Sequence, residues 1–140
     1  MNSVKNYSSF VKFEHTLFSL PMILAGAFLA WWGLPDLKLL LLIILAGTGA
    51  RTAALAINRI LDRKIDALNP RTKDRELPSG KLSLTKAYAV TIAGLILYFA
   101  AAYMICDLVL YLSPIPLAVF IIYPLMKRFT WLCHFGVGLG

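Results

Sequence analysis

Charged residues are scarce in this chain of 140 residues, where they make up 15% of the sequence against 59% hydrophobic residues. Together with a mean hydropathy of +0.73, this composition excludes an ordinary soluble domain. Histidine and cysteine are scarce as well, with two residues of each kind. They show no ligand spacing, so the sequence does not support a zinc or haem site built from His15, His134, Cys106 and Cys133.

Long stretches of apolar residues make up most of the sequence. Four of them approach the roughly 20 residues that a transmembrane helix needs: residues 15–35, 39–58, 87–106 and 108–126. A fifth run opens after Arg128 and reaches Gly140. We therefore expect an all-α, polytopic membrane protein, with residues 1–140 forming one C-terminally incomplete transmembrane domain of four spans and the start of a fifth. Three prolines within the runs are expected to kink their helices: Pro21, Pro114 and Pro116.

The basic residues gather on one side of the predicted membrane. All of the fourteen Lys and Arg except Lys38 lie in the N-terminal segment, between Arg51 and Lys86, or directly after the fourth run. The positive-inside rule then places the N-terminus and a basic loop over residues 67–83 in the cytoplasm. We expect a multi-pass protein of the inner (plasma) membrane. Aromatic residues expected at the opposite interface agree with this orientation: Trp31, Trp32, Tyr103 and Tyr111.

Most of the charge is concentrated in one segment. Nine of the fourteen Lys and Arg, and four of the seven acidic residues, lie between Arg51 and Lys86. The net charge of +7 does not indicate nucleic acid as a partner, because these residues border membrane helices and no nucleic-acid-binding module is visible. Anionic lipid headgroups or a phosphate-bearing substrate suit such a segment better. We therefore expect the lipid bilayer and a phosphate compound as partners.

Three polar residues recur at every fourth position near the end of the second predicted helix: Asn58, Asp62 and Asp66. Successive members of such a series are about 40° apart around a helix, so all three share one face. Two carboxylates and an amide oxygen are hard ligands that suit Mg²⁺, which commonly takes one or two carboxylates together with substrate phosphates. The pattern predicts a magnesium site in which these residues have metal-binding and catalytic roles.

Basic residues follow the two carboxylates, in the connection to the next predicted helix. Asn69 and Pro70 are predicted to end one helix, and the next is predicted to begin around Ser83. Between them lie three basic side chains predicted to bind substrate phosphate: Arg71, Lys73 and Arg75. An acidic helix face beside a mobile basic connection suits a metal-bridged diphosphate. Arg51 lies about 20° from Asn58 around the helix and roughly 10 Å deeper, where it either faces a substrate cavity or pairs with a neighbouring helix.

A structural interpretation of the same charges stays open at this point. Arg59, Arg63 and Lys64 are spaced to form solvated ion pairs with the two aspartates on a juxtamembrane helix, each contributing about 0.2 to 0.5 kcal/mol. The basic residues of the connection would then act only as topology signals. Spacing alone does not decide between a ligand site and a solvated helix face.

The sequence N-R-I-L-D-R-K-I-D at 58–66, followed by N-P-R-T-K-D-R-E-L-P-S-G at 69–80, resembles the first acidic motif, N-x-x-x-D-x-x-x-D, and the following loop of the UbiA superfamily of intramembrane aromatic prenyltransferases. The segments F-E-H-T-L-F-S-L-P at 13–21 and Y-P-L-M-K-R-F-T-W-L at 123–132 resemble the bacterial 4-hydroxybenzoate polyprenyltransferase branch. The resemblance covers essentially the whole chain. One departure is Glu76, where many members have proline.

This resemblance implies a ring of nine transmembrane helices around a lipid-accessible cavity, of which the chain is the N-terminal half. Asn58, Asp62 and Asp66 match the motif that holds the diphosphate of an isoprenyl donor through Mg²⁺. Arg71 and Arg75 match basic positions of the loop that helps to cover this diphosphate. The second Asp-rich motif of the family is absent from this sequence, so the 140 residues alone are expected to be inactive.

The function implied is transfer of a polyprenyl group from a polyprenyl diphosphate to an aromatic acid, 4-hydroxybenzoate, by a Mg²⁺-dependent enzyme of ubiquinone- or menaquinone-type quinone biosynthesis. Two alternatives are kept. In the first, the enzyme transfers the prenyl group to a naphthoate-type quinone precursor or a haem. In the second, the chain is a non-catalytic membrane module that binds phosphate-bearing lipid through the basic connection. Mg²⁺-dependent consumption of a prenyl diphosphate separates the enzymes from the module.

Overall fold

Helices alone make up the regular structure of the residues that are described. The computed structural model describes residues 2–11, 13–31 and 33–126, with the side chains of 7–11, 19–31, 33–122 and 124–126. Its elements in chain order are α1 (Asn2–Val11), α2 (Phe13–Trp31), α3 (Leu37–Leu68), α4 (Leu84–Ile105), α5 (Asp107–Leu112) and α6 (Pro114–Met126). Across these ranges there is no strand, so the all-α prediction is confirmed. The fifth predicted span, after Arg128, lies outside the described residues.

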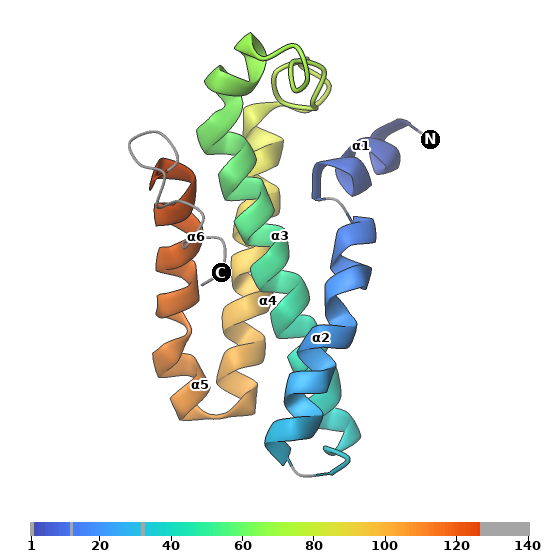
Figure 1. The fold of residues 1–140 in the computed structure, drawn as a ribbon, viewed down its shortest axis with the longest axis vertical. Coiled ribbons are helices and arrows are strands. Elements are labelled where there is room, and N and C mark those ends of the chain that lie inside the picture. The colour runs from blue at the N-terminus through green and yellow to red at the C-terminus, as the bar shows by residue number, and fades with distance from the viewer. Residues whose placement is uncertain (1, 12, 32, 127–140) are drawn as a thin grey trace.

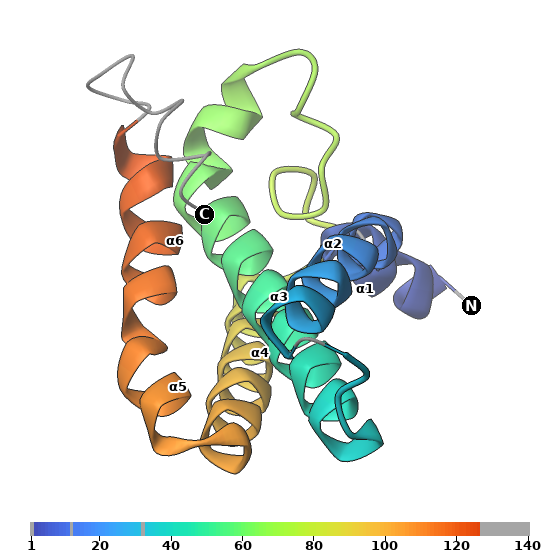
Figure 2. The same ribbon diagram turned by 60° about the horizontal axis from the view of Figure 1, so that its bottom comes forward.

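The long helices stand side by side. α3 and α4 form the most extensive pair, and α2 and α6 lie on opposite sides of it (Figure 1, Figure 2). Three segments are long and apolar enough to cross a membrane: Leu37–Leu68, Leu84–Ile105 and Asp107–Met126. The described apolar part of α2, Ser19–Trp31, is shorter. These helices make the chain a multi-pass membrane protein, as its composition predicts.

Helix α3 is longer than a bilayer is thick. Its 32 residues extend for ~48 Å at 1.5 Å per residue, whereas a hydrocarbon core measures about 30 Å. Roughly 20 residues from Leu37 are therefore enough to cross the membrane. The rest of the helix, from about Asn58 to Leu68, continues beyond the apolar layer without a break. The polar residues predicted to share a face thus stand on a rigid extension of a membrane helix.

Two predicted spans end or break differently in the structure. The span predicted over 15–35 ends as helix at Trp31, and a short non-helical segment that includes Pro35 leads to α3. The span predicted over 108–126 is interrupted at Ser113, directly before Pro114. Because proline has no N–H, it cannot donate to the Leu110 carbonyl, which instead accepts the Ser113 hydroxyl at 2.7 Å.

Small residues let α3 and α4 approach closely. A Cβ atom added at Gly49 would lie 2.7 Å from the backbone nitrogen of Tyr98 and 2.8 Å from the carbonyl oxygen of Gly94. One added at Gly94 would lie 2.9 Å from the backbone nitrogen of Ala53. The two backbones are therefore in direct contact, the kind of packing that small residues permit between membrane helices.

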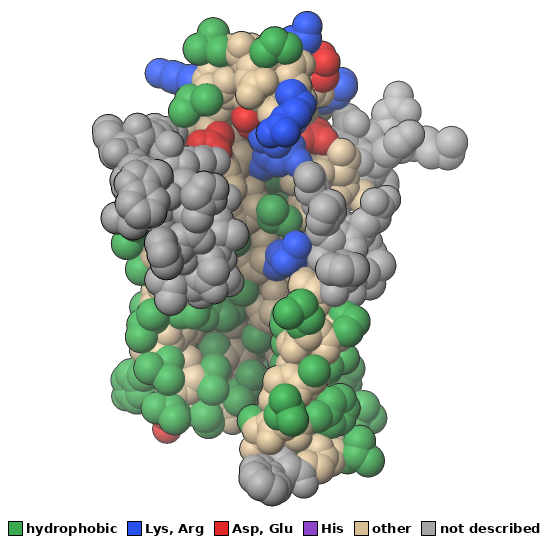
Figure 3. Space-filling view, in the orientation of Figure 1, with side chains coloured by type: hydrophobic (Ala, Val, Ile, Leu, Met, Phe, Trp, Pro, Cys, Tyr) green, Lys and Arg blue, Asp and Glu red, His purple; other side chains and the backbone are tan. Residues whose placement is uncertain are grey.

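Charge and apolar surface are separated along the helices. Figure 3 shows Lys, Arg, Asp and Glu gathered at the end of the molecule where α3 meets α4, above hydrophobic helix faces. At the other end, aromatic side chains on α2, α4 and α5 are exposed: Trp31, Tyr103 and Tyr111. This distribution is typical of a protein whose outer faces meet lipid and whose polar ends meet water.

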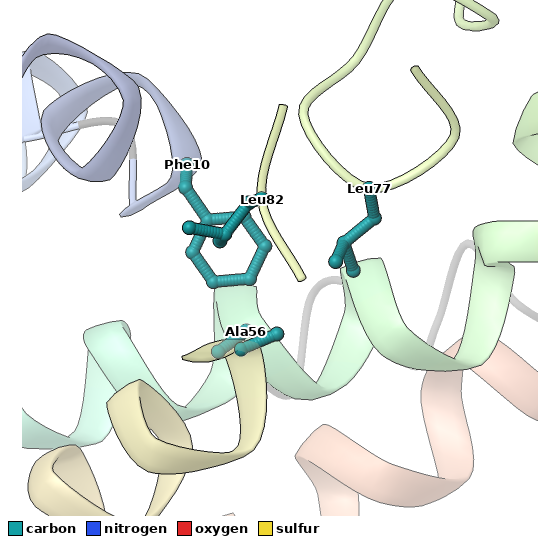
Figure 4. Close-up of a cluster of buried hydrophobic side chains, with 5 residues drawn as sticks. Phe10, Ala56, Leu77 and Leu82 are labelled. Atoms are coloured by element: carbon teal, nitrogen blue, oxygen red, sulfur yellow. The ribbon is translucent and has the colours of Figure 1, made fainter. Parts of the chain in front are cut away.

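The connection predicted to be mobile, between α3 and α4, is instead folded. Asn69 ends α3, and the Ser83 hydroxyl accepts a hydrogen bond from the Lys86 amide at 3.4 Å to cap α4, as the sequence predicts. Gly80 adopts a φ of 73°, which suits glycine. Apolar side chains of the connection enter a buried cluster shared with α1, α3 and α4 (Figure 4): Phe10, Ala56, Leu77, Leu82 and Ala87.

Candidate functional site

The acidic face of α3 is largely buried. Asp62 is 5% exposed and Asp66 is 7% exposed, and Asn58 is half-buried. Their spacing of four residues on one continuous helix turns them toward a common side. Aspartate is seldom fully buried unless it is paired. The end of α3 beyond the apolar layer is therefore a polar site rather than a solvated helix surface.

Arg75 reaches this face from the connection. Its Nη1 donates to Asp66 Oδ2 at 2.8 Å, and the Asp66 side chain is only 10% exposed in this pair. The hydroxyl of Thr72 donates to the Asp66 carbonyl oxygen at 3.0 Å, which ties the same residue to the connection a second time. The structure thus brings a predicted phosphate-binding arginine onto a predicted metal ligand. The roles themselves stay predictions.

Arg71 and Lys73 take a different place. Both are exposed, and their backbone amides fold back on Asn69: Arg71 donates to the side-chain oxygen at 3.0 Å and Lys73 to the carbonyl oxygen at 2.9 Å. In the described part of the chain, the ion pairs of the connection involve Arg75 and Glu76 and not these two residues. Their predicted contact with substrate phosphate remains untested by this arrangement.

Arg51 lies within the membrane part of α3. It is half-buried, and its Nε is a buried donor without a hydrogen-bond partner among the described residues. Ionisable residues at such depth are costly and normally face the protein interior or a water-filled cavity. The structure therefore favours an inward-facing Arg51, while its predicted contact with substrate stays a prediction.

Sequence reasoning missed a second ion pair, between Arg59 and Glu76. Arg59 Nη1 lies 2.7 Å from Glu76 Oε2, and the two side chains are 10% and 11% exposed. The other carboxylate oxygen of Glu76 accepts the Ser9 hydroxyl at 2.5 Å, and the Arg59 guanidinium lies 6.0 Å from the centre of the Phe10 ring. The expectation that Arg59 belongs to a solvated pair is therefore wrong, because it is buried and bonded to a residue 17 positions away.

The environment of Glu76 favours its charged form. Burial acts to raise the pKa of this carboxyl, but the hydrogen bond from Ser9, a backbone hydrogen bond and the nearby Arg59 outweigh it, so the pKa lies below its usual value. Glu76 is therefore held as a carboxylate between an arginine and a hydroxyl. The one sequence signal for it was its departure from the proline that many UbiA members have at this position.

The acidic face offers oxygen ligands only. Within the described ranges no three His, Cys, Asp or Glu side chains come together as a metal site. Asp62, Asp66 and the amide oxygen of Asn58 make a partial set of hard donors. Such a set suits Mg²⁺, which keeps several waters and is often completed by substrate phosphates. It does not suit zinc, whose structural sites are closed by nitrogen and sulfur ligands.

Known proteins match most or all of this chain. A protein of Marinomonas sp. named 4-hydroxybenzoate octaprenyltransferase is 32% identical over 143 residues, a match that takes in 100% of this chain and 50% of that protein. A protein of the same name from Aliivibrio fischeri is 38% identical over 113 residues, with 81% of this chain and 40% of that protein covered. The chain spans about half the length of the first of these relatives.

A solved structure has the same fold. The apo structure of a UbiA homolog from Aeropyrum pernix K1 superimposes with a TM-score of 0.84 at 42% identity, and the match covers 89% of this chain and 45% of that one. The family pattern described as the UbiA prenyltransferase family matches residues 19–140. Since this match takes in most of the chain and includes the acidic end of α3, the chain belongs to the UbiA prenyltransferase family.

Proposed function

We propose that the full-length protein transfers a polyprenyl group from a prenyl diphosphate to 4-hydroxybenzoate in quinone biosynthesis. The observation that carries this proposal is the contact of Arg75 with Asp66, 2.8 Å apart, at the polar end of apolar helices. Acidic ligands and an anion-binding arginine stand together where a water-soluble head and a lipid tail would meet. The names of the relatives support the acceptor and the polyprenyl donor.

Mg²⁺ fits the donor set of this site. Asn58, Asp62 and Asp66 would hold it with their side-chain oxygens, and when bound it supplies positive charge to the diphosphate leaving group. Asp66 already has a positive partner in Arg75. The acidic face is therefore built to carry positive charge at this position, whether from a side chain or from an ion.

The residues of the chain have separate tasks in this proposal. Cleavage of the allylic C–O bond leaves a carbocation and a diphosphate whose negative charge grows as the bond breaks. Arg75 would donate hydrogen bonds to the diphosphate oxygens, which strengthen as this charge develops. Arg71 and Lys73, which are exposed on the same connection, would meet the outer oxygens. The apolar faces of α3 and α4 would keep water from the cation until the aromatic carbon attacks it. That ring carbon would then give up its proton to water at the polar end.

The placement in the membrane follows the distribution of charge. We propose that residues 1–140 belong to one transmembrane domain and that the connection over 67–83 and the N-terminus face the cytoplasm of an inner (plasma) membrane. The aromatic acid would then reach the site from the cytoplasm, and the polyprenyl tail would lie along the helices in the bilayer. A labelling reagent that cannot cross the membrane would modify a cysteine placed at Lys73 only from the cytoplasmic side.

The donor site does not fix the acceptor. A naphthoate-type quinone precursor or a haem would also receive a prenyl group from the same acidic face. A screen of radiolabelled acceptors with one prenyl diphosphate separates these enzymes by their products. If the full-length protein binds phosphate-bearing lipid and consumes no prenyl diphosphate under any metal condition, the chain is a membrane module instead.

The metal site is tested by Asp62→Asn in the full-length protein, with Asp36→Asn as its control. Asp36 precedes the opposite end of α3 and its side chain makes no cap hydrogen bond, so the control repeats the chemical change far from the site. Both variants are expected to insert normally. Mg²⁺-dependent turnover is expected to fall below detection in Asp62→Asn alone, and near-normal turnover in that variant would exclude the metal-binding role.

A further inference from the structure

We propose that Ser9, Arg59 and Glu76 form a latch that positions Arg75 on the acidic face of α3. The proposed function gives none of the three a contact with the diphosphate, so they act as positioning residues. The role of Arg75 in donor binding rests on the proposed function, whereas the latch itself rests only on the contacts below.

The latch joins three separate parts of the chain through one carboxylate. Glu76 belongs to the connection, Arg59 to α3 and Ser9 to α1. One oxygen of Glu76 pairs with Arg59 at 2.7 Å, and the other accepts the Ser9 hydroxyl at 2.5 Å. Both oxygens are therefore occupied by residues of different helices. A carboxylate that only kept the chain soluble would be exposed, whereas Glu76 is 8% exposed.

The backbone around Glu76 shows what the latch holds. The Glu76 carbonyl oxygen accepts the amide of Leu82 at 2.9 Å, which closes the following turn. The next residue, Leu77, is buried in the cluster with Phe10 (Figure 4). Glu76 is thus the point where a side chain fixes the connection to α1 and α3, and where its backbone closes a turn within the connection.

Arg75 stands between two such fixed points. On one side, Thr72 is bonded to the Asp66 carbonyl oxygen at 3.0 Å, and on the other, Glu76 is bonded to Arg59. Arg75 also has contacts of its own, because its amide donates to the Thr72 carbonyl oxygen at 3.1 Å and its side chain, 35% exposed, pairs with Asp66. Without Glu76 in place, the connection would lose the fixed point next to Arg75, and the guanidinium would sample more positions. A guanidinium that is already in place binds an anion without paying this ordering cost again.

The latch is tested with Arg59→Gln in the full-length protein, against Arg63→Gln as a matched control. Arg63 lies one turn further along α3 and is only half-buried, so it repeats the same substitution on the same helix. Neither change alters the sequence of the connection, whose basic residues are trypsin sites. In Arg59→Gln we expect cleavage after Arg75 to be at least about tenfold faster than in the wild-type protein and the control, because cleavage follows the population of the opened segment.

The kinetic arm uses prenyl diphosphate and 4-hydroxybenzoate. For Arg59→Gln we expect the KM for the diphosphate to rise about tenfold, with kcat and the acceptor KM within about twofold, because a charge-assisted contact is disordered and not removed. A purely structural role would lower the amount of active enzyme and hence kcat, with the donor KM unchanged. The charge-reversed double variant Arg59→Glu with Glu76→Arg is expected to restore much of the donor KM.

Each outcome decides the proposal. Unchanged trypsin protection in Arg59→Gln refutes the latch, and faster cleavage with an unchanged donor KM refutes its role in positioning Arg75. If Arg59→Gln does not fold, Ser9→Ala removes one partner of Glu76 and keeps the ion pair, and it is expected to show the same two changes at smaller size; their absence refutes the proposal. If the wild-type protein consumes no prenyl diphosphate, the proposed function fails, while the cleavage rates still decide whether the latch exists.

Discussion

The crossing of α3 and α4 gives a prediction whose size follows from three glycines. Gly49→Ala would place a Cβ atom 2.7 Å and 2.8 Å from backbone atoms of α4, which cannot rotate away. Gly47→Ala would meet only the side chain of Ile23, whose terminal Cδ1 would lie 2.9 Å from the new Cβ. Gly26→Ala would meet no atom within 4 Å in the described part of the chain. The same methyl group is thus added against a backbone, against a flexible side chain and into open space.

The three substitutions are expected to change the free energy of unfolding by amounts that differ in sign. Alanine favours the helical state by about 1 kcal/mol relative to glycine inside a helix. Gly26→Ala is therefore expected to raise the free energy of unfolding by up to that amount. Overpacking costs typically 1 to 3 kcal/mol, and rigid backbone partners favour the upper end. Gly49→Ala is therefore expected to lower the free energy of unfolding by about 2 kcal/mol. For Gly47→Ala the change in the free energy of unfolding is expected to be near zero, because Ile23 can change its rotamer.

The assay is thermal unfolding of the full-length protein in one detergent, with the fraction remaining monodisperse after heating measured for the three variants in parallel. The expected order of stability is Gly26→Ala, then Gly47→Ala, then Gly49→Ala. A Gly49→Ala protein as stable as Gly26→Ala would refute backbone contact between α3 and α4, and with it the account of how these helices are aligned.

Three further predictions concern the polar end and Arg51. Arg75→Ala is expected to raise the donor KM at least about tenfold, whereas Arg71→Ala, which changes an exposed side chain, is expected to raise it less than half as far, measured by steady-state kinetics. Because the pKa of Glu76 is lowered in the fold, its stabilising effect is complete above about pH 4.3 and is lost as the pH falls through the lowered value. The difference in thermal stability between wild-type and Glu76→Gln is therefore expected to shrink below about pH 4. Arg51→Met is expected to retain thermal stability and lose turnover if Arg51 faces substrate, and unchanged turnover would indicate a structural role.

The sequence predicts the helices well where local signals are strong. Asn69 with Pro70 ends α3, and Ser83 caps α4, because capping and proline effects depend only on neighbouring residues. The end of α2 at Trp31 is harder to place, because no charged residue marks the end of the apolar run before Asp36. Hydropathy reports burial in lipid and does not report where a helix stops.

The candidate site was only partly predictable. A spacing of four places Asn58, Asp62 and Asp66 on one face, since helix geometry decides it. The pairing of Arg59 with Glu76 spans 17 positions and depends on how the connection folds back over α3. That path goes with the burial of Leu77 and Leu82 in one cluster with Phe10, which joins segments far apart in the sequence. Periodicity carries no information about such contacts.

Because α3 is unbroken, a small tilt at one point of the helix moves its far end. The contact at Gly49 lies 17 residues before Asp66 on the same helix, a distance of about 25 Å along its axis. Tilting a stiff rod of that length by about 5° moves its far end by roughly 2 Å, enough to shift the acidic face and the connection tied to it relative to α1 and α4. Substitutions or lipids that shift the crossing deep in the bilayer would therefore act on the acidic face without touching it, and bilayer thickness itself would become a variable in the proposed binding of diphosphate.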